Sequence, residues 1–301
     1  MISLQQKRFI TRSLFFAAFL LAPVLDLFRF DLTTTQFVIF GERLSFELTT
    51  QWLAQTDALD AGLRILTRFL LPLVSLIAIG LFVFWRWGRI YCGWLCPHFS
   101  VVETINRMMR QRLGRVSLWE PQVDQSAEGG LLNWVVIVST SVAIAFVWAL
   151  GLLSYLLPPL PLYSDLIHLQ LSGGEIIFLA VATTVFTLDF IFARHLFCKY
   201  GCAFGVFQSL FWMMNPKALV VAFDTDRAKA CQSCDKDCEE ACPMRLSVRG
   251  YKRAKFTCTQ CGECVSACQN VQKNNPDGTL IDWRAGEKTK QTSLIPMVNK
   301  D

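Results

Sequence analysis

Eight of the twelve cysteines lie in two runs in the C-terminal part of the sequence, and their spacing is typical of iron–sulfur ligands. Three thiolates a few residues apart can surround one face of a cluster. The second run has the spacing of bacterial ferredoxins, and the first has one extra residue between its second and third cysteines. The runs are Cys231-x2-Cys234-x3-Cys238-x3-Cys242-Pro243 and Cys258-x2-Cys261-x2-Cys264-x3-Cys268.

Each run is expected to complete the cluster of the other, because in two-cluster ferredoxins the fourth cysteine of a run ligates the second cluster. A zinc ribbon needs only two Cys-x2-Cys pairs, and disulfides are disfavoured in the cytoplasm. Two [4Fe–4S] clusters are therefore favoured over both alternatives. Cluster one would take Cys231, Cys234, Cys238 and Cys268, and cluster two would take Cys258, Cys261, Cys264 and Cys242.

The remaining four cysteines form two Cys-x3-Cys pairs, Cys92 with Cys96 and Cys198 with Cys202. Residues four apart share one face of a helix, so we expect each pair to present both thiols together. The two pairs are predicted to form a third redox or metal site, which would hold a third cluster, copper or another soft metal, or act as a dithiol. The alternative is that they are small buried apolar side chains.

Composition places these cysteines in a membrane protein. Of the 301 residues, 53% are hydrophobic and 18% charged, and the mean hydropathy is +0.37, which excludes a disordered chain and disfavours a soluble enzyme. Four apolar stretches approach the ~20 residues that a bilayer requires. A signal peptide is the alternative for the first stretch. The predicted spans are Thr11–Phe28, Ile65–Trp87, Leu131–Leu157 and Glu175–Phe197.

The predicted architecture is an α-helical membrane domain with about four transmembrane helices, followed by a small α+β two-cluster ferredoxin domain. Each hairpin of helices ends in one Cys-x3-Cys pair, so the hairpins form two parallel repeats. Lys and Arg cluster in the segments expected to be cytoplasmic, which indicates a multi-pass protein of a bacterial inner membrane with both termini in the cytoplasm. The predicted domains are 1–214 in the membrane, 215–285 holding the clusters, and 286–301 as a polar tail.

A few other polar residues are weaker candidates. His98 and His195 flank the two Cys-x3-Cys pairs, here called the membrane-edge cysteines, and would tune or ligate a metal there. His168 would bond a quinone or a partner. Asp189 lies inside the fourth span, where an acid is costly unless paired, so it would relay a proton or anchor Arg86, Arg89 or Arg194. The basic run 249–255 is interpreted as a solvated connector rather than a docking site.

These motifs resemble the membrane polyferredoxins, whose NapH, NosR and CcoG types combine transmembrane hairpins, Cys-x3-Cys motifs and a two-cluster ferredoxin domain. The resemblance covers about Arg8 to Trp283, and Ala203 stands where the family usually has proline. It implies electron transfer between a quinol or cytoplasmic donor and a respiratory partner. For the CcoG type it implies copper reduction during assembly of an oxidase.

The favoured hypothesis is a membrane-bound iron–sulfur electron carrier, with a copper-reducing assembly factor and a redox-sensing regulator as alternatives. The expected partners are membrane lipid, a redox partner protein and a second copy of the chain, and the expected ligands include quinone. No Rossmann or P-loop glycine pattern occurs, and we expect no nucleic acid as a partner.

Overall fold

The computed structural model describes residues 3–34, 36–44, 57–115, 118, 130–231 and 234–286. The chain divides into two compact units, each assembled from distant segments. The first unit comprises Met1–Phe9, Ser75–Trp94 and Cys198–Asp301, and the second comprises Ile10–Val74 and Leu95–Phe197. The predicted domain boundary at residue 214 stays a prediction, and the predicted polar tail lies outside the described residues after Gly286.

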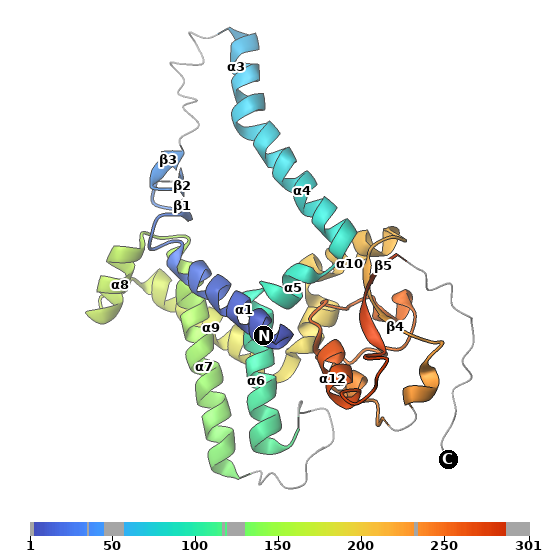
Figure 1. Ribbon diagram of the computed structural model, residues 1–301. Helices are drawn as coiled ribbons and strands as arrows, with labels where there is room; N and C mark the ends of the chain where they lie inside the picture. Colours follow the sequence, from blue (N-terminus) through green and yellow to red (C-terminus); the bar gives the residue numbers. More distant parts are fainter. Residues whose placement is uncertain are drawn as a thin grey trace. The chain divides into compact units, whose positions relative to one another are not determined.

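Helices make up most of the described chain (Figure 1). The α-helices are α1 (Leu4–Leu21), α3 (Ala58–Ile65), α4 (Leu71–Trp87), α5 (Ile90–Trp94), α6 (Pro97–Leu113), α7 (Leu131–Ser154), α8 (Pro159–Ile167), α9 (Gly173–Leu188), α10 (Ala203–Met214), α11 (Asp237–Glu240) and α12 (Glu263–Val271). The π-helical turns are η1 (Leu66–Leu70), η2 (Asp189–Ala193) and η3 (Phe197–Gly201), and the 3-10 turns are η4 (Ala228–Cys231) and η5 (Lys252–Lys255).

Three helical segments are long and apolar enough to cross a membrane, namely Gly62–Trp87, Leu131–Ser154 and Gly173–Ala193. The first predicted span is wrong in its extent, because α1 runs from Leu4 to Leu21 and Phe28 begins a strand. Pro23 disfavours continuation of the helix, since it lacks an N–H and restricts the residue before it. A fourth crossing therefore stays a prediction.

The expected loop between the first two spans contains a three-stranded antiparallel sheet of β1 (Phe28–Asp31), β2 (Gln36–Ile39) and β3 (Glu42–Leu44). Gly41, with φ +78°, permits the turn between β2 and β3. Arg29 is buried in this sheet and pairs with Asp26 at 2.6 Å and Asp31 at 2.9 Å. The sheet thus has its own internal charge compensation.

The core of the second unit is formed by α7 against α9, with α6 packed on α7. A capping box starts α9, because the Ser172 hydroxyl accepts from the Glu175 N–H while the Glu175 carboxylate accepts from the Ser172 N–H at 2.7 Å. The predicted end of this span at Phe197 is wrong, since the helical segment stops at Ala193. Arg194 follows with φ +44°, a conformation that cannot continue a right-handed helix.

The cysteine-rich part of the first unit is small and has mixed structure. β4 (Leu219–Phe223) and β5 (Ile281–Ala285) form a two-stranded antiparallel sheet, and α12 contacts β5. Helices α11 and α12 pack against each other. Figure 1 shows these elements gathered at the C-terminal end of the described chain. This arrangement places both cysteine runs on short elements around one sheet.

Candidate functional site

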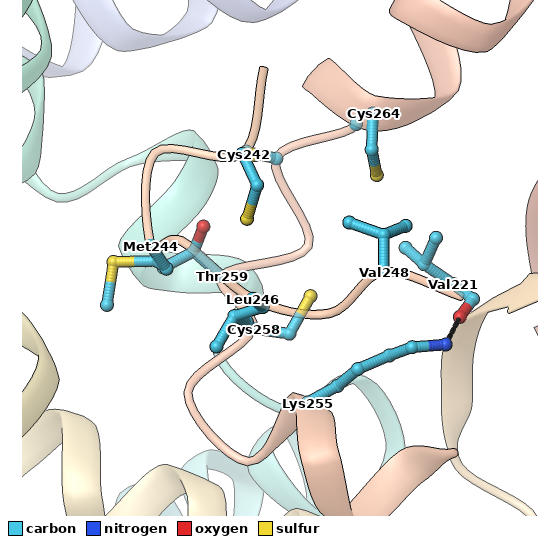
Figure 2. A pocket seen from close by; sticks show the side chains of 11 residues that line it. Val221, Cys242, Met244, Leu246, Val248, Lys255, Cys258, Thr259 and Cys264 are labelled. Atoms are coloured by element: carbon cyan, nitrogen blue, oxygen red, sulfur yellow. Dashed lines mark hydrogen bonds between the residues drawn. The ribbon is translucent and has the colours of Figure 1, made fainter. Parts of the chain in front are cut away.

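Four cysteines from both runs line one pocket, namely Cys242, Cys258, Cys261 and Cys264. Figure 2 shows the thiols of Cys242, Cys258 and Cys264 pointing toward the same central space. The unfilled space is about 380 Å³, counting the part open to solvent. These are the four residues that the sequence assigns to cluster two, and their role as ligands stays a prediction.

Tight backbone turns bring these thiols to the pocket. Gln260 has φ +55° and Gly262 has φ +75°, so the chain reverses between Cys258 and the start of α12. Gln260 is buried and fixes the turn: its side chain donates to the Leu219 carbonyl at 3.1 Å and accepts from the Trp283 indole at 3.1 Å. Cys264 then lies in the first turn of α12.

Apart from the cysteines, the walls of the pocket are mostly apolar, with Thr259 and one cation as polar residues. Val221, Met244, Leu246 and Val248 line it together with Lys255, whose ammonium donates to the Val221 carbonyl at 2.7 Å (Figure 2). Burial raises the pKa of Cys258 to about 11, with the neighbouring Cys242 adding to the effect. Thiolates therefore persist here only beside compensating positive charge, which bound iron would provide.

The second predicted ligand set comprises Cys231, Cys234, Cys238 and Cys268. Cys238 lies on α11 and Cys268 on α12, two helices in contact, and both residues are buried. Burial raises the pKa of Cys238 to about 12, and Glu239, Cys234 and Cys231 add to this effect. The Cys234 thiol donates to the Asp237 carboxylate at 3.2 Å. The structure thus places Cys231, Cys234 and Cys238 near one another.

The pocket offers four cysteine thiols as donors. Among the described residues, no group of three or more His, Cys, Asp or Glu side chains is arranged to hold one metal ion. A zinc ion binds thiolates at ~2.3 Å, so its ligands lie within ~4.6 Å of one another. Four thiols are the donor set that a four-iron cluster takes, so the residues that line the pocket suit that group chemically.

The Cys-x3-Cys pairs do not each share one continuous helix face, so that expectation is wrong. α5 ends at Trp94, and Cys96 is the extended N-cap residue of α6. Pro97 is the cause, since it disfavours helical geometry in the residue before it. In the second pair, Cys198 lies in η3 and Cys202 is the extended N-cap of α10.

The membrane-edge cysteines are distributed over the two units. Cys92, Cys198 and Cys202 belong to the first unit and Cys96 to the second. The Cys92 thiol donates to the Gln208 side chain at 3.4 Å, and the Cys202 sulfur accepts from the Gly205 N–H at 3.4 Å. These sulfurs thus take part in polar contacts rather than in purely apolar packing.

Asp189 pairs with His98, a partner not among those expected from the sequence, and the proton relay stays a prediction. The His98 Nε2 lies 2.6 Å from the Asp189 carboxylate, and the imidazole packs against Phe190 and Phe197. The carboxylate is in the segment Gly173–Ala193, where a polar partner offsets the cost of leaving water. His98 approaches from α6, two residues after Cys96.

Loss of this pair should destabilise the second unit. Asp189→Ala is expected to lower the free energy of unfolding by about 1–3 kcal/mol, because the partly buried imidazole of His98 loses its hydrogen-bond partner. Thermal unfolding in detergent, followed by tryptophan fluorescence, measures the change. Asp189→Asn retains an acceptor oxygen and should lose less, and equal losses in the two variants would contradict a role for the hydrogen bond.

The other two histidines lie in different surroundings. His195 is buried immediately after Arg194, and His168 lies at the exposed end of α8, where its Nδ1 is 2.8 Å from the Ser164 carbonyl. Their predicted roles at a metal or a quinone stay predictions.

Sequence reasoning missed the buried cations of the first unit. The run 249–255 is not a solvated connector throughout, since Lys252 and Lys255 are buried and donate to backbone carbonyls. Arg8 and Arg89 are likewise buried, although both count among the basic residues from which the sequence predicts the orientation. Arg89 lies three residues before Cys92 in the sequence, and this closeness was the available signal that it could act at the cysteines.

Comparison with known proteins gives a partial family match and several distant relatives. A family model described as a 4Fe-4S binding domain matches residues 67–115 and 173–218, and each matched segment carries one Cys-x3-Cys pair. Relatives include the putative electron transport protein YccM of Escherichia coli and the ferredoxin-type protein NapH of Haemophilus influenzae. The chain is thus similar to membrane polyferredoxins, and its matched segments are those of a 4Fe-4S binding domain.

The similarity of this chain to its relatives is distant. It is 25% identical to YccM over 201 residues, 66% of this chain and 53% of YccM, and 24% identical to NapH over 205 residues, 66% of each. Protein NirI of Paracoccus denitrificans is 28% identical over 280 residues, 89% of this chain and 37% of NirI. The chain spans about half to two thirds of the first relatives it matches. No solved structure matches it.

Proposed function

We propose that this protein carries single electrons at the cytoplasmic face of a bacterial inner membrane through two [4Fe–4S] clusters. The observation that carries the proposal is the convergence of Cys242, Cys258, Cys261 and Cys264 on one pocket with a buried ammonium in its wall. A quinol or a cytoplasmic reductant would supply the electrons, and a respiratory partner protein would accept them. Both termini are proposed to lie in the cytoplasm.

The residues of the pocket prepare it for a negatively charged group. The clusters, when bound, supply reversible one-electron chemistry. Apolar side chains such as Val221 and Met244 exclude water, and the Lys255 ammonium offsets part of the charge of four thiolates. Gln260 holds the loop that carries Cys258 and Cys261, so little rearrangement is needed when an electron arrives.

The proposed third site comprises Cys92, Cys96, Cys198 and Cys202. Its support is the family model, whose two matched segments contain these four residues and none of the other eight cysteines. Copper receives no support from the relatives, whose names refer to electron transport and ferredoxins where they state a role. Copper reduction and redox sensing are therefore kept as outcomes of the test below.

Metal and sulfide analysis of the full chain, purified anaerobically in detergent, tests the proposal. We expect about eight irons and eight sulfides per chain, and a reduced-cluster EPR signal after dithionite, because each [4Fe–4S] cluster holds four of each. About twelve irons would place a further cluster at the membrane-edge cysteines. Fewer than about six irons, with zinc or copper in their place, would overturn the electron-carrier proposal.

A further inference from the structure

Arg89 is a buried guanidinium that joins the backbones around the two Cys-x3-Cys motifs. Its Nε donates to the Gly205 carbonyl at 2.6 Å and its Nη1 to the Cys198 carbonyl at 3.0 Å, while the side chain itself lies three residues before Cys92. Arg89 is only 2% exposed, and its Nη2 has no hydrogen-bond partner among the described residues. A charge buried in this way requires compensation.

The compensating groups around Arg89 are thiols rather than carboxylates. Burial lowers the pKa of the guanidinium, and the thiolates of Cys92, Cys202, Cys198 and Cys258 oppose that effect. The first three belong to the membrane-edge motifs, and the fourth belongs to the pocket proposed for cluster two. Arg89 therefore lies within electrostatic range of both thiol sets.

Direct contacts hold the pocket loop against this region. Gly93, the residue after Cys92, packs so closely on Thr259 that an added Cβ would lie 2.1 Å from the Thr259 carbonyl oxygen. The Trp94 indole donates to the Gln260 carbonyl at 3.0 Å. α5 thus rests on the loop that connects Cys258 to Cys261, and the approach of the two thiol sets is built into the fold.

The other predicted cluster has a different arginine. Arg249 pairs with the Glu239 carboxylate at 3.4 Å, and the thiolates that act on its pKa, after burial and Glu239, are those of Cys231 and Cys238. Arg249 is therefore already neutralised by a carboxylate and has no described interaction with the membrane-edge thiols. It offers a matched control for Arg89.

We propose that Arg89 is the shared counter-cation of the membrane-edge cysteines and of cluster two, and that it couples the reduction potential of cluster two to the charge at Cys92, Cys198 and Cys202. This inference rests on the proposed function, since it requires the clusters to be present. A nearby positive charge favours the added electron, and a nearby thiolate opposes it.

Potentiometric titration of the full chain in detergent, followed by EPR, tests the coupling. Arg89→Gln should lower the midpoint reduction potential of cluster two by about 59 mV or more, which is a tenfold change in the equilibrium constant for one electron. Arg89→Lys keeps the positive charge and should have a potential close to that of the wild type. Arg249→Gln should shift cluster one instead. Cys264→Ser and Cys231→Ser identify which signal belongs to which cluster.

A second variant keeps the test informative if Arg89→Gln does not assemble. Cys198→Ser removes one negative group beside Arg89 and should raise the potential of cluster two while cluster one stays unchanged. An unchanged cluster-two potential in Cys198→Ser, or in an Arg89→Gln protein that assembles, would overturn the inference alone. Equal shifts of both clusters in Arg89→Gln would overturn it as well. Absence of iron from the wild-type protein would instead overturn the proposed function.

Discussion

Replacing Cys264 with serine should remove one cluster and leave the other, with the loss of about four irons per chain. Cys242→Ser should abolish the same EPR signal, although Cys242 belongs to the other cysteine run, because both residues line the same pocket. Iron analysis and EPR of the dithionite-reduced variants measure both effects.

The matched control for these variants is Cys238→Ser. Cys238 lies in the same run as Cys242 but on the helix that faces Cys268, and its substitution should remove the other signal. If Cys242→Ser and Cys238→Ser abolished the same signal, each run would hold its own cluster and the crossed ligand sets would be wrong.

Replacing Gly93 with alanine should disturb the pocket from outside it. The added Cβ would lie 2.1 Å from the Thr259 carbonyl oxygen and 3.1 Å from the carbonyl carbon, so the backbone must move. We expect a loss of about 1–3 kcal/mol or more in unfolding free energy, as for other overpacked sites. The displaced loop carries Cys258 and Cys261, and faster loss of iron on dilution into chelator should follow.

Gly80→Ala is the control for that substitution. Gly80 is also helical, but an added Cβ would meet nothing within 4 Å. Thermal unfolding and the rate of iron release, measured for both variants, separate a local clash from a general effect of replacing glycine. Equal iron release from Gly93→Ala and the wild type would show that the contact with Thr259 does not support the pocket.

The cysteine pattern predicted more of the site than of the membrane domain. The crossed assignment of Cys242 with the second run anticipated which thiols line one pocket, because ligand spacing reflects the geometry of a small cluster. Hydropathy located the three long apolar helices but not their ends. Two helices end close to Pro23 and Arg194, where the backbone does not continue a helix. Hydropathy averaged over about 20 residues does not detect such local backbone preferences.

Contacts between distant residues could not be predicted from the sequence. Asp189 had several charged candidates as partner, and only the packing of α6 against η2 selects His98. The same holds for Arg89, since its carbonyl partners are more than a hundred positions away. Lysine is rarely buried, so the sequence predicts that Lys255, which lies in a basic run, is exposed to solvent. Only its contact with a backbone carbonyl in the structure explains its burial.

The N-terminal helix has a consequence for the order in which the protein matures. Arg8 is buried, with its Nε donating to the Gly93 carbonyl at 2.7 Å and its Nη1 to the Glu263 carboxylate at 2.9 Å, a residue 255 positions later. At about 5–20 residues per second, translation of that interval takes roughly 13–50 s. The first helix therefore leaves the ribosome well before Glu263 exists. Insertion of the proposed cluster two, three of whose ligands lie on either side of Glu263, would thus belong to the end of biogenesis.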